Sequence, residues 1–219
     1  MTIFGFADDL ILVIPRDSIK EVEVEAFHII EKWMKSVKLE LSHDKTEIIL
    51  VSTTRKVEAA NITVGGIEIT SKRYLKYLKV MLDDRLNFKQ QVEHACERAG
   101  RTHAALARVM PNKHGPNSSK RRLLASITTS SLRYGAPIWL SALQIKSNRQ
   151  KLNKIFRVSV LRVISGYRTF SMEAAAVIAG MIPICNKLEE DVACYEMKLQ
   201  GIANVKEARK QAGRLSAEK

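Results

Sequence analysis

The chain has 219 residues and a formal net charge of +13, and its 46% hydrophobic and 27% charged residues are typical of a globular protein with a sizeable core. No run of about 18 apolar residues is present, and the first residues lead directly into a charged turn, so the sequence predicts neither a membrane-spanning helix nor a signal peptide. Three cysteines without C-x-x-C spacing argue against a disulfide framework and a zinc site, and we expect free thiols in a reducing compartment.

The positive charge is concentrated in one segment. Between Glu97 and Glu173 the chain carries 15 Lys and Arg residues and no acidic residue, whereas the remainder carries 21 basic and 23 acidic residues. Such a segment favours a polyanionic partner, because neutralised phosphates release their counterions. Any one of these cations can instead belong to a solvated helix face. The candidates for nucleic-acid binding are Arg98, Arg101, Arg108, Lys120, Arg121 and Arg122.

The first part of the chain is expected to form short strands around one helix. Two apolar runs, 2–6 and 10–14, are separated by the acidic turn Ala7-Asp8-Asp9, which is hairpin spacing. After Pro15, apolar residues recur at helical period up to Val37, which predicts a helix. Further expected features are a buried strand at 46–52, a hairpin at 62–69 turning at Gly65-Gly66, and a strand at 74–82 whose following Asp83-Asp84 cap the next helix.

From residue 88 onward the apolar pattern is helical. Asn117 and Ser118 are suitable caps for a helix, Gly135 and Pro137 interrupt the pattern, and Trp139 lies among apolar residues as expected for a core side chain. The sequence therefore predicts an α+β fold, in which a small sheet-containing part precedes a basic helical part. The expected helices cover 87–110, 117–134, 147–164, 171–179 and 186–211.

The pair Asp8-Asp9 is the first candidate for chemistry. At the tip of a tight hairpin two carboxylates can both project, and Mg²⁺ prefers oxygen ligands of this kind. A two-metal site needs a further carboxylate from another strand. The alternative is that the pair only stabilises a turn, where aspartate is favoured for local hydrogen bonding.

The surrounding motifs carry a family resemblance. The string Gly5-Phe6-Ala7-Asp8-Asp9-Leu10 resembles the [F/Y]-A-D-D hairpin of reverse transcriptases. Leu39-Glu-Leu-Ser42, Lys45-Thr46-Glu47 and residues 77–83 follow in order and are similar to the later palm motifs and primer grip of non-LTR (LINE-type) retrotransposon polymerases. Segments similar to the thumb and downstream region of type-1 elements that insert into arthropod ribosomal RNA genes are 110–112, 119–125, 134–139 and 179–183.

The resemblance implies a role for each matching part. Residues 1–87 would be the C-terminal part of a polymerase palm, 88–145 a thumb of basic helices, and 146–219 a helical C-terminal extension. Asp8 and Asp9 would be catalytic and hold Mg²⁺, and Lys45 would lie near the triphosphate. The primer grip would comprise Tyr77, Leu78, Lys79 and Val80, in which the family normally has glycine where Lys79 stands.

The implied reaction is RNA-directed DNA synthesis, in which a dNTP is added to a primer 3′ end by a two-metal mechanism. The implied partners are an RNA template, a DNA primer, and the N-terminal polymerase and endonuclease regions of the same polyprotein. We expect these regions to lie outside this chain, which would be inactive alone, intracellular, in the nucleus when acting on genomic DNA, and not bound to a membrane. Two alternatives are a basic helical nucleic-acid-binding module whose Asp-Asp turn is inert and a maturase-like relative, against which residues 180–183 argue.

Overall fold

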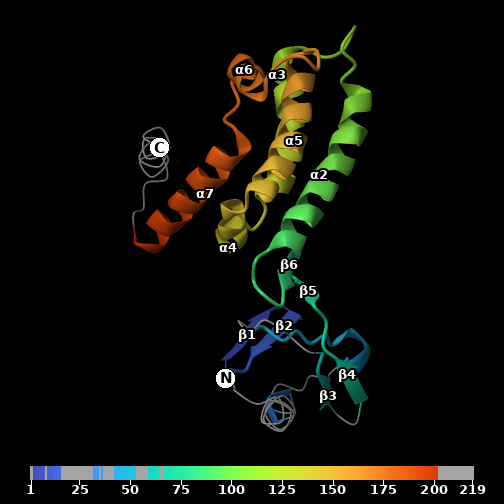
Figure 1. The fold of residues 1–219 in the computed structure, drawn as a ribbon, viewed down its shortest axis with the longest axis vertical. Helices are drawn as coiled ribbons and strands as arrows, with labels where there is room; N and C mark the ends of the chain where they lie inside the picture. The colour runs from blue at the N-terminus through green and yellow to red at the C-terminus, as the bar shows by residue number, and fades with distance from the viewer. Residues whose placement is uncertain are drawn as a thin grey trace. The chain divides into compact units, whose positions relative to one another are not determined.

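A computed structural model describes residues 2–7, 9–15, 32–34, 36, 42–52, 59–64 and 67–201 of the chain. Strands and helices both occur in it, which confirms the α+β class (Figure 1). The chain divides into two compact units, Met1–Leu86 and Asn87–Lys219, which we call the hairpin unit and the helical unit. The expected helix after Pro15 lies mostly outside the described residues.

Three antiparallel strand pairs form the sheet structure of the described part of the hairpin unit. Strand β1 (Thr2–Phe6) pairs with β2 (Asp9–Val13), and β3 (Asn61–Val64) pairs with β4 (Ile67–Thr70), as the sequence predicted. The third pair joins β5 (Tyr74–Tyr77) to β6 (Val80–Asp83). In each pair the register leaves two residues for the connection, the length of the commonest hairpin loops.

The prediction of a continuous strand at 74–82 is wrong. The chain reverses at Leu78 and Lys79, whose φ angles are 45° and 65°, so Tyr77 faces Val80 across a two-residue turn. Positive φ at both central positions is the geometry that normally selects Gly or Asn. Because neither residue type is present at this turn, the local sequence carries no turn signal there.

The prediction of a regular strand at 46–52 is also wrong. A 3-10 helix, η1 (His43–Lys45), precedes a segment that forms one isolated parallel bridge, between Ile49 and Lys72. Its backbone bonds are few: Lys72 N–H donates to the carbonyl of Ile48 at 2.7 Å, and Ser52 N–H to that of Asp84 at 3.2 Å. The apolar run therefore lies beside its neighbour without forming a ladder.

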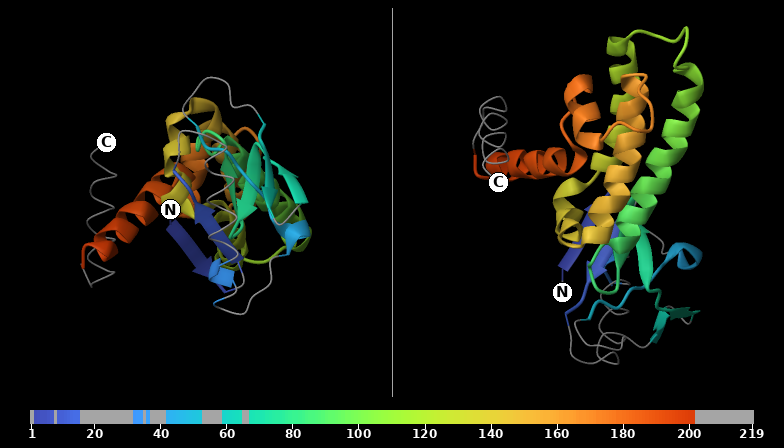
Figure 2. Two further views of the ribbon diagram at one scale, coloured as in Figure 1. Left: turned by 90° about the horizontal axis from the view of Figure 1, so that it is seen from below. Right: turned by 45° about the horizontal axis from the view of Figure 1, so that its top comes forward.

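The helices that the 3.6-residue period predicted are present in the helical unit, but the last of them ends at Leu199 and does not continue to residue 211. In Figures 1 and 2, α2, α3 and α5 run alongside one another, and they pack pairwise, while α6 and α7 pack against α5. No helix of the described ranges is long and apolar enough to cross a membrane. The elements are α2 (Lys89–Val109), α3 (Ser118–Arg133), α4 (Ala136–Trp139), the 3-10 helix η2 (Leu140–Gln144), α5 (Lys146–Val163), α6 (Met172–Ala179) and α7 (Ile184–Leu199).

The core of this unit follows from residue spacing. Buried Val92, Ala95 and Ala99 lie three and four residues apart on α2, so they share one face. Their small side chains allow neighbouring helices to approach closely. Phe156 of α5 is fully buried, and so is Trp139, whose indole Nε1 donates to the carbonyl of Tyr134 at 2.9 Å. The prediction that Trp139 packs in the core is confirmed.

The helix ends use local side chains and one glycine. Asn117 Oδ1 accepts from Lys120 N–H at 3.0 Å, which confirms the predicted cap of α3. Gly180, at φ 59°, ends α6, and the next residue bonds back to the carbonyl of Ala176 in a Schellman arrangement. Asp83 does not cap α2, contrary to expectation: it is buried in β6 and accepts from Arg85 N–H at 3.1 Å.

Candidate active site and nucleic-acid interface

The acidic hairpin turn supplies the candidate catalytic carboxylates. Asp9 is the first residue of β2, opposite Phe6, and is exposed; Ala7 in the same turn has a φ of 55°. Asp8 lies outside the described residues. A carboxylate at a strand end beside a tight turn is accessible to a metal ion or a nucleotide. The hairpin thus presents Asp9 without covering it.

The donor set for Mg²⁺ is incomplete in what the structure describes. Within those residues no three His, Cys, Asp or Glu side chains lie together in a way that could hold a metal ion. A two-metal site needs more carboxylates than Asp9 provides. The described residues alone therefore do not fit a complete polymerase metal centre.

Lys45 is the other predicted catalytic residue. It ends η1, its side chain is exposed, and its backbone N–H donates to the carbonyl of Ser42 at 3.2 Å. Among the described side chains, none is seen to hydrogen-bond or ion-pair with it. The structure thus leaves the Lys45 ammonium group accessible without joining it to Asp9.

The predicted primer-grip residues occupy the β5–β6 hairpin. Tyr77 and Val80 are the paired residues that flank the turn, with Val80 buried, while Leu78 and Lys79 form the turn itself. Lys79 is exposed at the tip. The four residues are therefore together, but as a hairpin end rather than along one strand.

Two of the predicted nucleic-acid-binding arginines, Arg98 and Arg121, donate hydrogen bonds within the helical unit. Arg121 is only 4% exposed, and its guanidinium donates to backbone carbonyls, including Nε to Pro116 at 2.7 Å. Arg98 is half-buried; its Nη2 donates to the carbonyl of Ser131 at 3.0 Å, and it lies 5.5 Å from the centre of the Tyr134 ring. Arg121 therefore does not present its charge on the exposed surface of the helical unit, as the prediction required.

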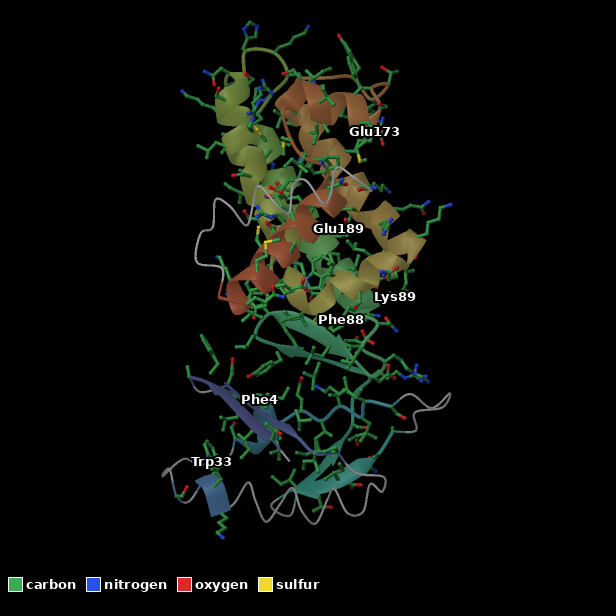
Figure 3. The ribbon with its side chains drawn as sticks, turned by 90° about the vertical axis from the view of Figure 1, so that its left-hand side faces the viewer. Phe4, Trp33, Phe88, Lys89, Glu173 and Glu189 are labelled. Carbon is green, nitrogen blue, oxygen red and sulfur yellow. The ribbon has the colours of Figure 1, made fainter. Side chains whose placement is uncertain are left out.

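The other four predicted cations, Arg101, Arg108, Lys120 and Arg122, are exposed. Among the described residues no carboxylate pairs with any of them. Carboxylates of this unit pair with other cations instead: Glu93 with Lys151, Glu190 with Lys187, and Asp191 with Arg133 through two hydrogen bonds of 2.5 and 2.8 Å. Figure 3 shows further acids of the unit, Glu173 and Glu189, on α6 and α7. The exposed cations are thus left uncompensated locally.

The thiols carry no sign of nucleophilic chemistry. Burial raises the pKa of Cys96 to about 11 and also raises the pKa of Cys185. A thiol is a nucleophile as its thiolate, so both side chains stay protonated and unreactive near neutral pH. All three cysteines are free, as the sequence predicted.

Sequence reasoning missed a polar pair between α2 and α5 that His103 forms with Ser159. Its Nδ1 lies 3.2 Å from the Oγ of Ser159, which is 1% exposed. Burial lowers the pKa of His103, and the neighbouring Arg162 adds to that effect. A serine so deeply buried cannot meet a substrate, so the pair is structural.

Sequence reasoning also missed the cavity beside Arg121 and Arg122. The start of α3, the residues just after α5 and the end of α6 form its wall. Ser118 and Ser165 lie with both arginines around one cavity. Two serines 47 positions apart carry no motif, since only the packing of α3 against α5 brings them together. No local sequence signal could have found this arrangement.

Comparison with known proteins gives a consistent set of relatives. The chain is 27% identical over 211 residues to a retrovirus-related Pol polyprotein from type-1 retrotransposable element R1 of Nasonia vitripennis, covering 92% of this chain and 61% of that protein. A second Nasonia R1 Pol polyprotein is 26% identical, covering 88% and 54%. A 115 kDa protein in the R1 element of Drosophila melanogaster is 26% identical, covering 82% of this chain and 18% of its own length.

No protein-family profile matches the chain, and no solved structure matches it significantly. The chain spans less than two thirds of each of the three relatives. Across 82–92% of its own length, however, the relatives are of one kind. The resemblance predicted from the sequence is therefore confirmed: this chain is a homologue of the Pol polyproteins of R1 type-1 retrotransposable elements of arthropods.

Proposed function

We propose that this chain is the distal palm and thumb region of an RNA-directed DNA polymerase from a non-LTR retrotransposon. The observation that carries the proposal is the match of 92% of the chain to an R1 Pol polyprotein. The order of the motifs supports it, from the Asp8-Asp9 turn through the β5–β6 hairpin to the basic helices. In this proposal the helical unit holds the template–primer duplex, and the hairpin unit contributes part of the catalytic site.

The charge distribution supports the binding part of the proposal. Arg101, Arg108 and Lys120 are exposed cations in a segment that contains no acidic residue. Contacts of such cations with phosphates position a duplex and do not read its sequence. We therefore propose an RNA template paired with a DNA primer as the partner, bound with a strong dependence on salt.

In the proposed catalytic part, Asp8 and Asp9 would be ligands of Mg²⁺ and Lys45 would offset charge on the triphosphate. Mg²⁺, when bound, would supply Lewis-acid chemistry at the primer 3′ hydroxyl and the dNTP phosphates. Because Asp8 and Asp9 cannot complete a two-metal site, we propose that the other regions of a Pol polyprotein supply the remaining carboxylates. The chain alone is then expected to extend no primer.

Binding is tested with an RNA–DNA hybrid that has a recessed 3′ end, titrated over a range of salt concentrations. The variant carrying R101Q, R108Q and K120Q should bind more weakly, with a salt slope lower by about 1 for each phosphate that is no longer neutralised. Asp8→Asn is the control and should not weaken binding. An unchanged slope in the triple variant would contradict the proposed duplex surface.

Catalysis is tested by replacing the matching segment of the Drosophila relative with this chain. Primer extension by the hybrid protein should require Asp8 and Asp9, so Asp8→Asn should abolish it, while the unaltered Drosophila protein serves as the reference. Extension that persists in the Asp8→Asn hybrid would remove the catalytic part of the proposal. It would favour the second candidate, a basic helical nucleic-acid-binding module, which the exposed cations of the helical unit support without any catalytic role.

A further inference from the structure

A cavity of about 420 Å³ opens in the helical unit where the start of α3, the residues after α5 and the end of α6 meet. Among the residues that the structure describes, none that lines this cavity is acidic. Its wall is part polar and part apolar, and the polar side chains are two arginines and two serines. The lining consists of Pro116, Ser118, Arg121, Arg122, Val163, Ile164, Ser165, Ile178 and Ala179.

Arg121 contributes a buried positive charge to this cavity. Its guanidinium donates to the carbonyls of Pro116 at 2.7 Å, Pro111 at 2.5 Å and Arg162 at 3.1 Å, with a longer bond to Met110. These acceptors are neutral, and within the described residues no carboxylate approaches it. Buried charges are normally paired, so a 4% exposed arginine held only by carbonyls leaves a positive site that an anion would stabilise.

Arg122 is the second cation of the cavity, and it is held differently. Its side chain is exposed, and the described part of the chain offers it neither a hydrogen bond nor an ion pair. Its guanidinium lies against the backbone of Gly180: a Cβ added there would stand 2.9 Å from Arg122 Nη2. The absence of a side chain at Gly180 therefore leaves room for the guanidinium beside the cavity.

We infer that this cavity binds one phosphate group of a nucleic-acid backbone, which Arg122 contacts directly. The hydroxyls of Ser118 and Ser165 are further donors, and Arg121 supplies buried positive charge. The planar guanidinium suits phosphate because its N–H groups can form two parallel charge-assisted hydrogen bonds. The inference rests on the proposed function, and it adds one defined contact to a surface that would otherwise act only through general charge.

The main test places a carboxylate in the cavity. Ser118 is the first residue of α3, where an acidic side chain favours the helix, so Ser118→Glu should fold. Ser147→Glu is the matched control: Ser147 is exposed, is the second residue of α5, and the change alters the net charge equally. Binding of the RNA–DNA hybrid should be about tenfold weaker in Ser118→Glu, with the salt slope reduced by about 1, and about twofold weaker or less in Ser147→Glu.

A second variant keeps the charge and moves the arginine. Gly180→Ala should displace the Arg122 guanidinium and weaken hybrid binding several-fold, and its melting temperature reports the strain of alanine at a φ of 59°. Arg122→Gln should weaken binding similarly, and combining it with Gly180→Ala should add little. Full additivity of the two changes would contradict a positioned contact.

The outcomes separate this inference from the proposed function. If the wild-type chain fails to bind the hybrid at all, the proposed function is wrong. If it binds with a steep salt dependence but the two Ser→Glu variants weaken binding equally, only the cavity inference is overturned. The inference is likewise overturned if inorganic phosphate shifts NMR signals around Ser165 while Ser118→Glu leaves the affinity for the hybrid unchanged. The cavity would then bind a small free anion and not the nucleic-acid backbone.

Discussion

Among the residues that the structure describes, the helical unit and the hairpin unit bury their apolar side chains to very different extents. In the helical unit, large side chains such as Trp139 and Phe156 are almost completely enclosed between helices. In the described part of the hairpin unit, Phe4 and Phe6 of β1 are 53% and 66% exposed, and the buried apolar residues are Met34, Ala60, Ile62 and Val80. Since stability comes mainly from buried apolar surface, the helical unit has its own core, whereas the described residues of the hairpin unit bury little apolar surface.

This difference corresponds to the roles proposed for the two units. A surface that grips a duplex needs a rigid support, which the α2, α3 and α5 packing supplies. Asp9 lies on the β1–β2 hairpin, whose Phe4 and Phe6 are exposed, as in a surface that takes part in an interaction. The described residues of the two units therefore differ in how much apolar surface they bury as well as in charge.

The largest expected effect on stability follows from removing Trp139, the largest fully buried side chain among the described residues. Trp139→Ala should lower the free energy of unfolding by about 3 to 5 kcal/mol, because it leaves a cavity and removes the bond to Tyr134. Phe6→Ala, in the other unit, should change it by about 0.5 kcal/mol or less. Urea unfolding of both variants checks the contrast; equal losses would show that the hairpin unit has a core of comparable strength.

The next effect concerns the buried arginine. Arg121→Met should lower the free energy of unfolding by about 2 to 3 kcal/mol, because the carbonyls around residues 110–116 lose their donor. Arg122→Met is the matched control and should have little effect, since that side chain is exposed. Unfolding in guanidinium chloride measures both variants. A larger loss of stability in Arg122→Met would show that Arg122, and not Arg121, is the buried arginine.

A smaller effect of opposite sign is expected at the β5–β6 turn. Lys79→Gly should raise the free energy of unfolding of the hairpin unit by about 0.5 to 1 kcal/mol, because glycine adopts a φ of 65° without strain. Lys76→Gly, in the extended strand β5, should instead destabilise it. Amide hydrogen exchange across β5 and β6 follows both changes, and a loss of protection in Lys79→Gly would argue against the positive φ.

The smallest effect is a pH dependence of the helical unit. The pKa of His103 is lowered in the folded state below its ordinary value of 6.5, so the unfolded chain binds more protons as the pH falls. Stability should be complete above about pH 6.5 and decrease as the pH falls from there toward the lowered folded pKa. Thermal melts between pH 7.5 and 5 should show this decrease, and His103→Gln should make the profile flatter. An unchanged profile in that variant would assign the titration to another group.

The helices could be predicted from the sequence better than the strands. The 3.6-residue period and the Asn117 cap located α3 within a residue at each end. The β5–β6 turn could not be predicted, because Leu78 and Lys79 adopt positive φ angles and neither is a glycine or an asparagine, the residue types that indicate such a turn. For the candidate site, the Asp8-Asp9 hairpin and the exposed Arg101, Arg108 and Lys120 were accessible to sequence reasoning, since local spacing and charge carry them.

The sequence by itself determined the α+β class, the relationship to R1 Pol polyproteins and the position of the acid-free basic segment. These features depend on residue order and periodicity, which are local. Only the tertiary structure decided that Arg121 is buried while Arg122 is exposed, and that Ser118 and Ser165 line one cavity. Adjacent residues on a helix point about 100° apart, so the packing of α3 against α5 chooses which cation faces inward.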